Sequence, residues 1–324
     1  MYEQLLNALA DDINAGGVTA KVLTGHEHDP GPSALALRLL GSVHRLVLQG
    51  RAGELAAFYP SVGGRWAAEP GTAAFLRLLS DQPDVVQEWL DRPPQTNEVG
   101  RSSALYGGLL QLPARLPVRL FEIGSSGGLN LLADRYRYRN EAGAWFGASE
   151  SPVVLDPAWR GRPLEGWPVQ VVERCGCDRL PVDPSTSEGR LVLTAYVWPD
   201  QAARLDRLRG ALEEAARGPA PVRRMSAGEF VAGLDLAPGT TTVLWHSVMR
   251  QYMSADERAE VDAGVAELGS QASAEAPFVL LFLEPLRRTP GSKHEFLVVM
   301  RAWPGGAQRL LGTSVGHGVP TTWE

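Results

Sequence analysis

The stretch Leu120-Phe-Glu-Ile-Gly-Ser-Ser-Gly-Gly-Leu-Asn130 decides the fold of this chain. Its first half is a short apolar run typical of a buried strand, and its second half is a glycine-rich turn that leads into a helical pattern. In α/β domains this geometry lets backbone N–H groups at the start of the helix face a ligand. The glycines are needed there because any Cβ would hold the ligand away.

The sequence differs on the two sides of this stretch. Apolar residues recur every three or four positions over residues 1–112, with breaks at prolines, which predicts short helices. Beyond residue 116, apolar runs alternate with helical patterns, which predicts a doubly wound α/β domain with a mostly parallel sheet. The predicted strands are Val118–Ile123, Val169–Glu173, Val222–Met225, Thr241–Trp245 and Phe278–Leu283. We therefore expect an all-helical cap domain over residues 1–112 and an α/β domain over residues 113–324.

Two further segments predict hairpins. Residues 136–167 are too long for a simple connection and contain alternating apolar residues around Gly143 and Gly147, which predicts an inserted β-hairpin. The C-terminal segments His294–Trp303 and Gln308–Ser314 flank Pro304-Gly305-Gly306. They predict a second hairpin that closes one edge of the sheet.

Composition narrows the class of partner. The 324 residues carry 31 Lys and Arg against 37 Asp and Glu, a formal net charge of -6. Nucleic acid and anionic membranes attract clustered basic residues, so we expect neither as a partner and favour a small molecule. Apolar runs such as Phe278–Leu283 are far too short to span a membrane. The first residues lack the pattern of a signal peptide, so we expect a cytoplasmic protein.

Metal and disulfide sites are not expected. Cys175 and Cys177 are separated by one residue, which disfavours an intrachain disulfide and supplies half of a structural zinc set. We expect reduced thiols. His26 and His28 resemble metal ligands in composition, but they lie in a turn-rich segment without a distant partner set, so a solvated loop is the favoured interpretation.

Glu122 points to a particular ligand. An acid at the end of a strand would repel a pyrophosphate but would hold a cation, which favours S-adenosylmethionine over NAD or ATP because its methionine part carries an ammonium. The stretch resembles the first motif of class I S-adenosylmethionine-dependent methyltransferases, an acid followed by a G-x-G-x-G turn. Gly124 and Gly128 match this motif, whereas Ser126 stands at the middle glycine.

The resemblance extends from about Leu116 to the C-terminus and implies a Rossmann-like methyltransferase fold that binds S-adenosylmethionine. It implies that Asp178 holds the ribose, with Glu173 as the competing choice. Ser226 and Ala227 resemble the segment at the edge of the adenine.

The resemblance also covers the region after the fourth expected strand. Trp245-His246-Ser247-Val248 looks like the motif that follows this strand in the family. The helix that the family normally has after its fifth strand is missing between Glu284 and His294.

Three residues are candidates for chemistry. If the methyl acceptor carries an OH or NH group, His246 or Glu98 is the candidate base. Arg101 is the candidate partner for a carboxylate of the ligand or substrate, because arginine binds carboxylates through two parallel hydrogen bonds. The segment around Asn97 is equally consistent with a capping turn for the helix predicted over Ser102–Leu112.

Two alternatives stay open. Gly124–Gly128 also spells G-x-S-x-G, the nucleophile elbow of α/β-hydrolases, with Ser126 as nucleophile and His317 as base. A hydrolase sheet normally has several strands before its elbow, which this sequence does not predict. The second alternative is a non-catalytic nucleotide-binding or interaction protein with a degenerate methyltransferase pocket.

The whole chain also resembles a family of bacterial proteins of uncharacterised activity, through Thr96-Asn97-Glu98-Val99-Gly100-Arg101 and Pro304-Gly305-Gly306. This second resemblance implies no activity. The methyl acceptor, the pathway and the oligomeric state stay open.

Overall fold

The chain forms two compact units. The computed structural model describes residues 1–31 and 33–324 in full and residue 32 by its backbone alone. One unit contains residues 1–96 and 186–206, and the other contains residues 97–185 and 207–324. This division differs from the expected boundary at residue 112. Residues 97–112 belong to the sheet-bearing unit because their helix packs on strands, and residues 186–206 belong to the helical unit.

The first unit consists of helices in its described residues, as the apolar period predicts. Its core is formed by apolar side chains of several helices, among them the fully buried Leu5, Leu46 and Phe75. The elements are α1 (Tyr2–Asn14), α2 (Val18–Val22), the 3-10 helices η1 (Gly31–Ser33), η2 (Gly53–Phe58) and η3 (Pro60–Val62), and α3 (Leu35–Leu48), α4 (Ala68–Asp81), α5 (Pro83–Leu90) and α7 (Ser187–Ala195).

The segment containing α7 is fixed to the N-terminal helices by buried hydrogen bonds. His44 on α3 donates through Nδ1 to the carbonyl of Ala195 at 3.0 Å, and its Nε2 lies 2.8 Å from the Ser61 hydroxyl. The Trp89 indole donates to the Tyr196 hydroxyl at 3.0 Å. These contacts explain why a segment distant in sequence completes the helical unit.

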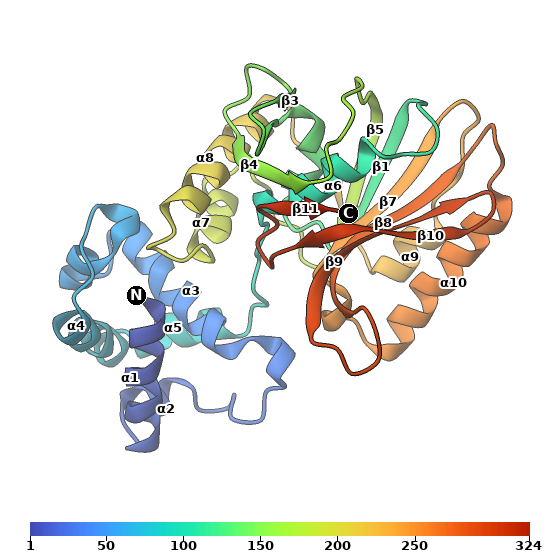
Figure 1. Cartoon of the computed structure of the whole chain (residues 1–324). Coiled ribbons are helices and arrows are strands. Elements are labelled where there is room, and N and C mark those ends of the chain that lie inside the picture. Colours follow the sequence, from blue (N-terminus) through green and yellow to red (C-terminus); the bar gives the residue numbers. More distant parts are fainter. The chain divides into compact units, whose positions relative to one another are not determined.

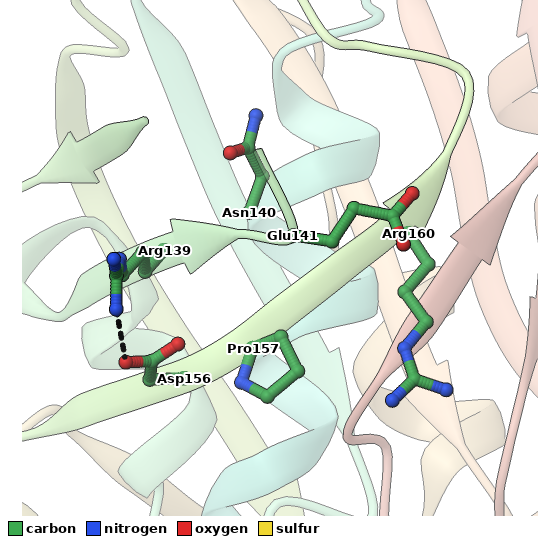
Figure 2. A pocket seen from close by; sticks show the side chains of 6 residues that line it. All are labelled: Arg139, Asn140, Glu141, Asp156, Pro157 and Arg160. Carbon is green, nitrogen blue, oxygen red and sulfur yellow. Dashed lines mark hydrogen bonds and ion pairs between the residues drawn. The ribbon is translucent and has the colours of Figure 1, made fainter. Parts of the chain in front are cut away.

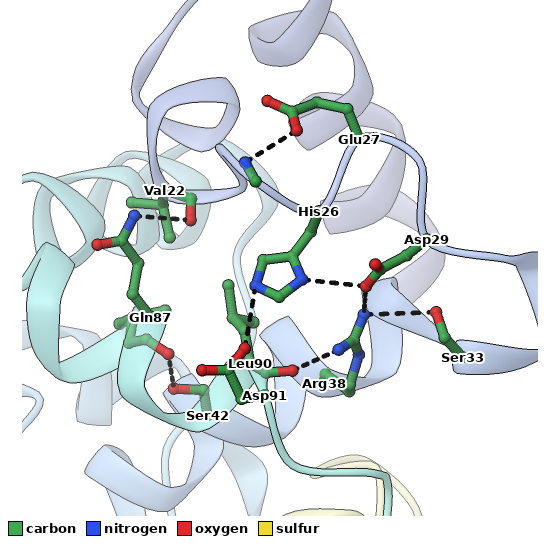
Figure 3. A network of polar contacts seen from close by, with 12 residues as sticks. Val22, His26, Glu27, Asp29, Ser33, Arg38, Ser42, Gln87, Leu90 and Asp91 are labelled. Atoms are coloured by element: carbon green, nitrogen blue, oxygen red, sulfur yellow. Dashed lines mark hydrogen bonds and ion pairs between the residues drawn. The ribbon is translucent and has the colours of Figure 1, made fainter.

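The loop before α3 is tied down through a polar network (Figure 3). His26 donates through Nδ1 to Asp29 at 3.0 Å, and Arg38 binds both Asp29 and the carbonyl of Leu90 at the end of α5. These bonds lower the pKa of Asp29, the Arg38 hydrogen bond most of all. The network gives His26 a structural role.

The strands of the described chain form one sheet with the order β3-β2-β4-β11-β10-β9-β8-β7-β1-β5-β6. Six of its neighbouring pairs are parallel and four are antiparallel. The strands are β1 (Val118–Ile123), β2 (Arg137–Asn140), β3 (Trp145–Gly147), β4 (Val154–Gly161), β5 (Val171–Asp178), β6 (Val222–Arg224), β7 (Thr241–Ser247), β8 (Phe278–Arg287), β9 (His294–Trp303), β10 (Ala307–Ser314) and β11 (Thr321–Trp323).

The parallel half contains the five strands that the apolar runs predict. Its order is β6-β5-β1-β7-β8, so the direction of winding reverses at β1 and the chain has a doubly wound α/β arrangement. The helices α9 (Ala227–Ala232) and α10 (Ala255–Gln271) lie on one face of the sheet, as Figure 1 shows. Their apolar side chains pack around Phe121 and Ile123. α6 (Ser102–Leu109) contacts Leu281, whose side chain projects from the opposite face.

The other half of the sheet contains both predicted hairpins. β2 and β3 pair antiparallel, which confirms the inserted hairpin, and β4 joins β2 in parallel. The C-terminal hairpin β9–β10 forms as predicted, but its expected position at an edge is wrong. β11 pairs with both β10 and β4, so the inserted strands continue the sheet beyond the hairpin, and the edges are β3 and β6.

One helical element of this unit differs from the predicted structure. The segment after the glycine-rich turn is the 3-10 helix η5 (Leu129–Arg135) rather than an α-helix. Its first five residues are all buried, so it lacks the exposed face of an amphipathic α-helix. The remaining elements are η4 (Val99–Arg101), η6 (Arg250–Tyr252) and α8 (Ala202–Arg217), of which residues 207–217 belong to this unit.

Three further expectations can be compared with the fold. β8 runs by a turn into β9, so the helix missing from the sequence after the fifth strand is also missing from the described chain. Cys175 and Cys177 are free thiols, as expected, and both are buried. No helix in the described part of the chain has the length and apolar character needed to cross a bilayer.

Candidate functional site

The glycine-rich turn follows β1 at the point where the strand order reverses. Gly124, Ser126 and Gly128 all have left-handed backbone conformations, with φ values of 71°, 53° and 70°. Ser126 is therefore a non-glycine residue in a conformation that a side chain disfavours. In doubly wound sheets ligands bind beside such a reversal, outside the carboxyl ends of the strands.

The amides of the turn are largely occupied by the protein itself. The Ser126 N–H donates to Asp178 Oδ2 and the Leu129 N–H to Asn97 Oδ1, both at 2.9 Å. The Ser125 N–H donates to the carbonyl of Cys177 at 3.0 Å. The expectation that amides at the start of the helix face a ligand is therefore wrong for Ser126 and Leu129, because side chains of neighbouring segments already accept from them.

The two glycines are required by their surroundings as well as by their φ values. A Cβ on Gly124 would lie 3.0 Å from the Met249 methyl group, and a Cβ on Gly128 would lie 2.9 Å from a methyl group of Val222. The loop after β7 and strand β6 thus pack directly on the turn. Substitution of either glycine is expected to disturb this packing whether or not a ligand binds.

Glu122, near the end of β1, is the most unusual acid of the site. Its side chain is 2% exposed, and Oε2 has no hydrogen-bond partner among the described residues. Burial raises the pKa of Glu122 well above its ordinary value, despite the opposing effects of the Trp245 indole and the Arg101 guanidinium. Asn130 on η5 has an equally buried, unpartnered Oδ1. A buried polar atom without a partner marks a place where a ligand can supply the missing interaction.

The two candidate ribose-binding acids lie at opposite ends of β5. Asp178 ends the strand and reaches the turn, where Oδ2 accepts from Ser126 and Oδ1 accepts from the Leu180 N–H at 2.9 Å. Glu173 is paired with Arg119 at 2.6 Å near the start of the strand. The structure therefore brings Asp178 to the glycine-rich turn and leaves Glu173 away from it.

Ser226 and Ala227 begin α9. Ser226 is the N-cap residue, and its hydroxyl and the Glu229 carboxylate form a reciprocal capping box. The Ala227 N–H donates to Glu257 at 3.2 Å. Ser226 therefore caps α9, and Glu257 satisfies the Ala227 amide. Both residues follow β6, the strand that pairs with the end of β5.

The segment before α6 contributes Glu98 and Arg101. Glu98 is buried, caps η4 by accepting from the Gly100 N–H at 3.1 Å, and lies 3.6 Å from His317 Nδ1. Arg101 donates to the carbonyls of Ser247 and Gly316 at 3.3 and 3.1 Å. The cap therefore lies on η4, and α6, for which the sequence predicts a capping turn, has no side-chain cap of its own. Arg101 connects this segment to the end of β7 through the Ser247 carbonyl.

His246, the other candidate base, is paired with a residue that sequence reasoning missed. His246 Nδ1 lies 2.8 Å from Glu284 Oε1, and their side chains are 2% and 4% exposed. A sequence signal exists, because both residues end apolar runs of neighbouring parallel strands. In the sequence, Glu284 stands out only as the polar residue that ends the fifth predicted strand. Nothing in the sequence indicates that it pairs with His246.

A separate groove of about 490 Å³ lies over the inserted strands (Figure 2). None of the residues predicted for the site lines it. Its carboxylates are already engaged: Asp156 pairs with Arg139 at 3.1 Å, and Glu141 accepts from the Gly161 N–H at 2.9 Å. The lining residues are Arg139, Asn140, Glu141, Asp156, Pro157 and Arg160.

Comparison with known proteins identifies one family. The family described as "Uncharacterized protein conserved in bacteria (DUF2332)" matches residues 1–323. No curated protein and no solved structure matches the chain. Among the described residues, no group of three or more His, Cys, Asp or Glu side chains is arranged to hold a metal ion.

Proposed function

The chain belongs to the bacterial DUF2332 family, and we propose that it is an S-adenosylmethionine-dependent methyltransferase acting on a small molecule. One observation carries the proposal. Glu122 and Asp178, from neighbouring parallel strands, flank one glycine-rich turn where the order of the strands reverses. This is where doubly wound folds bind nucleotide-like ligands.

The residues fit the cofactor. Glu122 has a buried carboxyl oxygen without a partner, which would accept from the ammonium of the methionine part. Asp178 would hold the ribose hydroxyls with the lone pairs that its two amide contacts leave unused. Ser226 and Ala227 would border the adenine. Bound S-adenosylmethionine supplies an activated methyl group, so the protein mainly has to align the acceptor and exclude water.

The raised pKa of Glu122 gives this binding a measurable signature. The carboxyl group holds its proton to a higher pH than an ordinary glutamic acid does. An ammonium beside it favours the ionised form, so Glu122 releases its proton as the ligand binds.

Calorimetric titration of the wild-type protein with S-adenosylmethionine and S-adenosylhomocysteine tests the proposal. Titration in two buffers of different ionisation enthalpy should show binding that is accompanied by proton release. Glu122→Gln should abolish the proton release and weaken binding, and Asp178→Asn should weaken binding. Glu173→Gln is the matched control and should bind like the wild type. Absence of binding of either compound to the folded wild type contradicts the proposal.

The hydrolase remains a second candidate because of one observation, the left-handed backbone of Ser126 within Gly124–Gly128. A nucleophile elbow also holds its serine in a strained turn. The 3-10 helix η5 is a poor substitute for the α-helix that follows such an elbow. Labelling of the wild type by a fluorophosphonate probe, and its loss in Ser126→Ala, would support the hydrolase.

A further inference from the structure

A buried histidine–carboxylate pair lies beside the proposed cofactor site. His246 is on β7 and Glu284 on β8, two neighbouring parallel strands, and the Nδ1 to Oε1 distance is 2.8 Å. The imidazole stacks on Phe282 with 5.1 Å between the ring centroids and an interplanar angle of 3°. The ring is therefore held both at its edge and on its face.

The environment of Glu284 keeps it ionised. Oε1 also accepts from the Met249 and Arg250 amides, at 3.1 and 3.4 Å. Burial raises the pKa of Glu284, but the His246 hydrogen bond and these amides outweigh burial, so the pKa lies below its ordinary value. An ionised carboxylate only accepts hydrogen bonds, so Nδ1 of His246 carries the proton. Nε2 is then the basic atom of the neutral ring.

The basic atom is unused by the protein. No hydrogen bond joins His246 Nε2 to any of the described residues, although the side chain is almost completely buried. Two further charged side chains near the ring pair with each other, because Arg250 binds Asp262 on α10 through two hydrogen bonds of 2.7 and 2.8 Å.

The chain after His246 leads directly to the glycine-rich turn. Ser247 accepts from Arg101, and Met249 packs on Gly124. Between them, Val248 has a φ of 51°, a conformation that is costly for a β-branched residue. Such strain persists where the surrounding structure enforces it, often at functional sites. The Glu284 carboxylate, which accepts from the next two amides, is one of the groups that enforce it.

We infer that His246 acts through Nε2 as the general base for the methyl acceptor, that Glu284 is its positioning residue, and that the acceptor is a hydroxyl compound. This inference rests on the proposed function. The acceptor oxygen gives its proton to Nε2 and forms a bond to the methyl carbon. The bond between this carbon and sulfur breaks, and its electron pair stays on sulfur. A carboxylate acceptor has already lost its proton at neutral pH and a thiol loses it easily, so neither requires such a base.

The first test measures the imidazole itself. Nitrogen NMR of histidine-labelled protein, with the His246 signals assigned by comparison with His246→Gln, should show a protonated Nδ1 and an unprotonated Nε2 at neutral pH. Glu284→Gln should reduce the preference for this tautomer, while Glu295→Gln on β9 should leave it unchanged. A wild-type His246 protonated at Nε2 overturns the inference.

The second test measures methyl transfer. Wild-type protein is incubated with tritium-labelled S-adenosylmethionine and a low-molecular-weight extract of bacterial cells, and the labelled products are identified by accurate mass. We expect O-methyl ethers. With the purified acceptor, His246→Gln should lower kcat by about 10²–10⁴-fold with an unchanged KM for S-adenosylmethionine. Glu284→Gln should lower kcat on the order of 10²-fold or more and alter the acid limb of the pH profile. His294→Gln is the control and should be fully active.

The outcomes separate this inference from the proposed function. If S-adenosylmethionine does not bind the wild type, the proposed function fails and the acceptor class fails with it. If it binds but the labelled products are thioethers or methyl esters, or if no product forms, only the present inference is overturned. Full activity of His246→Gln has the same consequence.

Discussion

Glu122 on β1 and Glu284 on β8 are buried acids of two strands that β7 separates, yet their surroundings shift their pKa values in opposite directions. Glu122 has one carboxyl oxygen without a partner, so burial dominates and its pKa rises. Glu284 accepts from one imidazole and two amides, so its pKa falls although burial opposes the change. The number of donors, rather than depth of burial, decides the direction in which each pKa shifts.

The opposite pKa shifts of Glu122 and Glu284 predict opposite effects of pH on what each residue contributes to the stability of the protein. Glu122 holds its proton to a higher pH in the folded protein than in the unfolded chain, where the proton is lost near pH 4.5, so its contribution to stability falls as pH rises above this value. Glu122→Gln should remove this loss, and urea unfolding from pH 4 to 8 should show the variant gaining stability relative to the wild type as pH rises.

Glu284→Gln is the matched comparison. The lowered pKa of Glu284 contributes stability that is present above its ordinary value of 4.5 and is lost as pH falls through the folded pKa. This variant should therefore lose stability relative to the wild type as pH rises toward 4.5, and the difference should stay constant above this value. The same pH trend in both variants would contradict the opposite directions of the two pKa shifts.

At the scale of single elements, the glycine-rich turn is defined by its close contacts with other strands. Gly128 has a φ of 70°, and a Cβ there would press on Val222 of β6 at 2.9 Å. Gly128→Ala should cost about 1–2 kcal/mol for the left-handed backbone and roughly another 1–3 kcal/mol for overpacking. Urea unfolding measures the sum.

Two variants separate these contributions. Gly239 has a φ of 79° with no heavy atom within 4 Å of an added Cβ, so Gly239→Ala should cost only the backbone part. Val222→Ala combined with Gly128→Ala should recover the overpacking part, relative to Val222→Ala alone. If Gly128→Ala and Gly239→Ala cost the same, the turn is less tightly packed than its contacts indicate.

At the scale of the whole molecule, a helical unit is assembled from two distant parts of the chain. Residues 186–206 interrupt the α/β unit in sequence but pack with residues 1–96. The hydrogen bonds from His44 to Ala195 and from Trp89 to Tyr196 join the two parts. This organisation predicts two further properties of the molecule.

The first property is acid sensitivity. Burial lowers the pKa of His44 to about 4, compared with an ordinary value of 6.5. Between these two pH values His44 is protonated in the unfolded chain but not in the folded protein. The free energy of unfolding therefore decreases by roughly 3 kcal/mol as pH falls from 6.5 to about 4. In unfolding titrations His44→Gln should be less stable than the wild type at neutral pH. Its free energy of unfolding should decrease less steeply than that of the wild type as pH falls. An unchanged slope would contradict the role of His44.

The second property is retention of a cut fragment. If a protease site is introduced between Gln95 and Thr96 and cleaved, both fragments should co-elute in size-exclusion chromatography, because the second fragment carries residues 186–206. Tyr196→Ala removes the partner of Trp89 and a buried ring, so the fragments of this variant should separate more readily. Complete separation of the wild-type fragments would contradict this organisation.

The sequence by itself determined the parts of this protein that depend on local patterns. The helical period of the first hundred residues, the buried strand Val118–Ile123 with its glycine-rich turn, and both hairpins could be predicted, because apolar spacing and turn residues act over a few positions. Glu122, Asp178 and His246 could be singled out for the same reason, since each lies at or next to the end of an apolar run.

Only the tertiary structure decided which of these parts meet. The pairing of β11 with β4, the return of residues 186–206 to the helical unit, and the contact between His246 and Glu284 join residues far apart in sequence. Asn97 and Asp178 occupy amides of the turn for the same reason. Such contacts depend on side-chain complementarity between distant segments, which no local pattern encodes, and they set the charges and the free atoms of the candidate site.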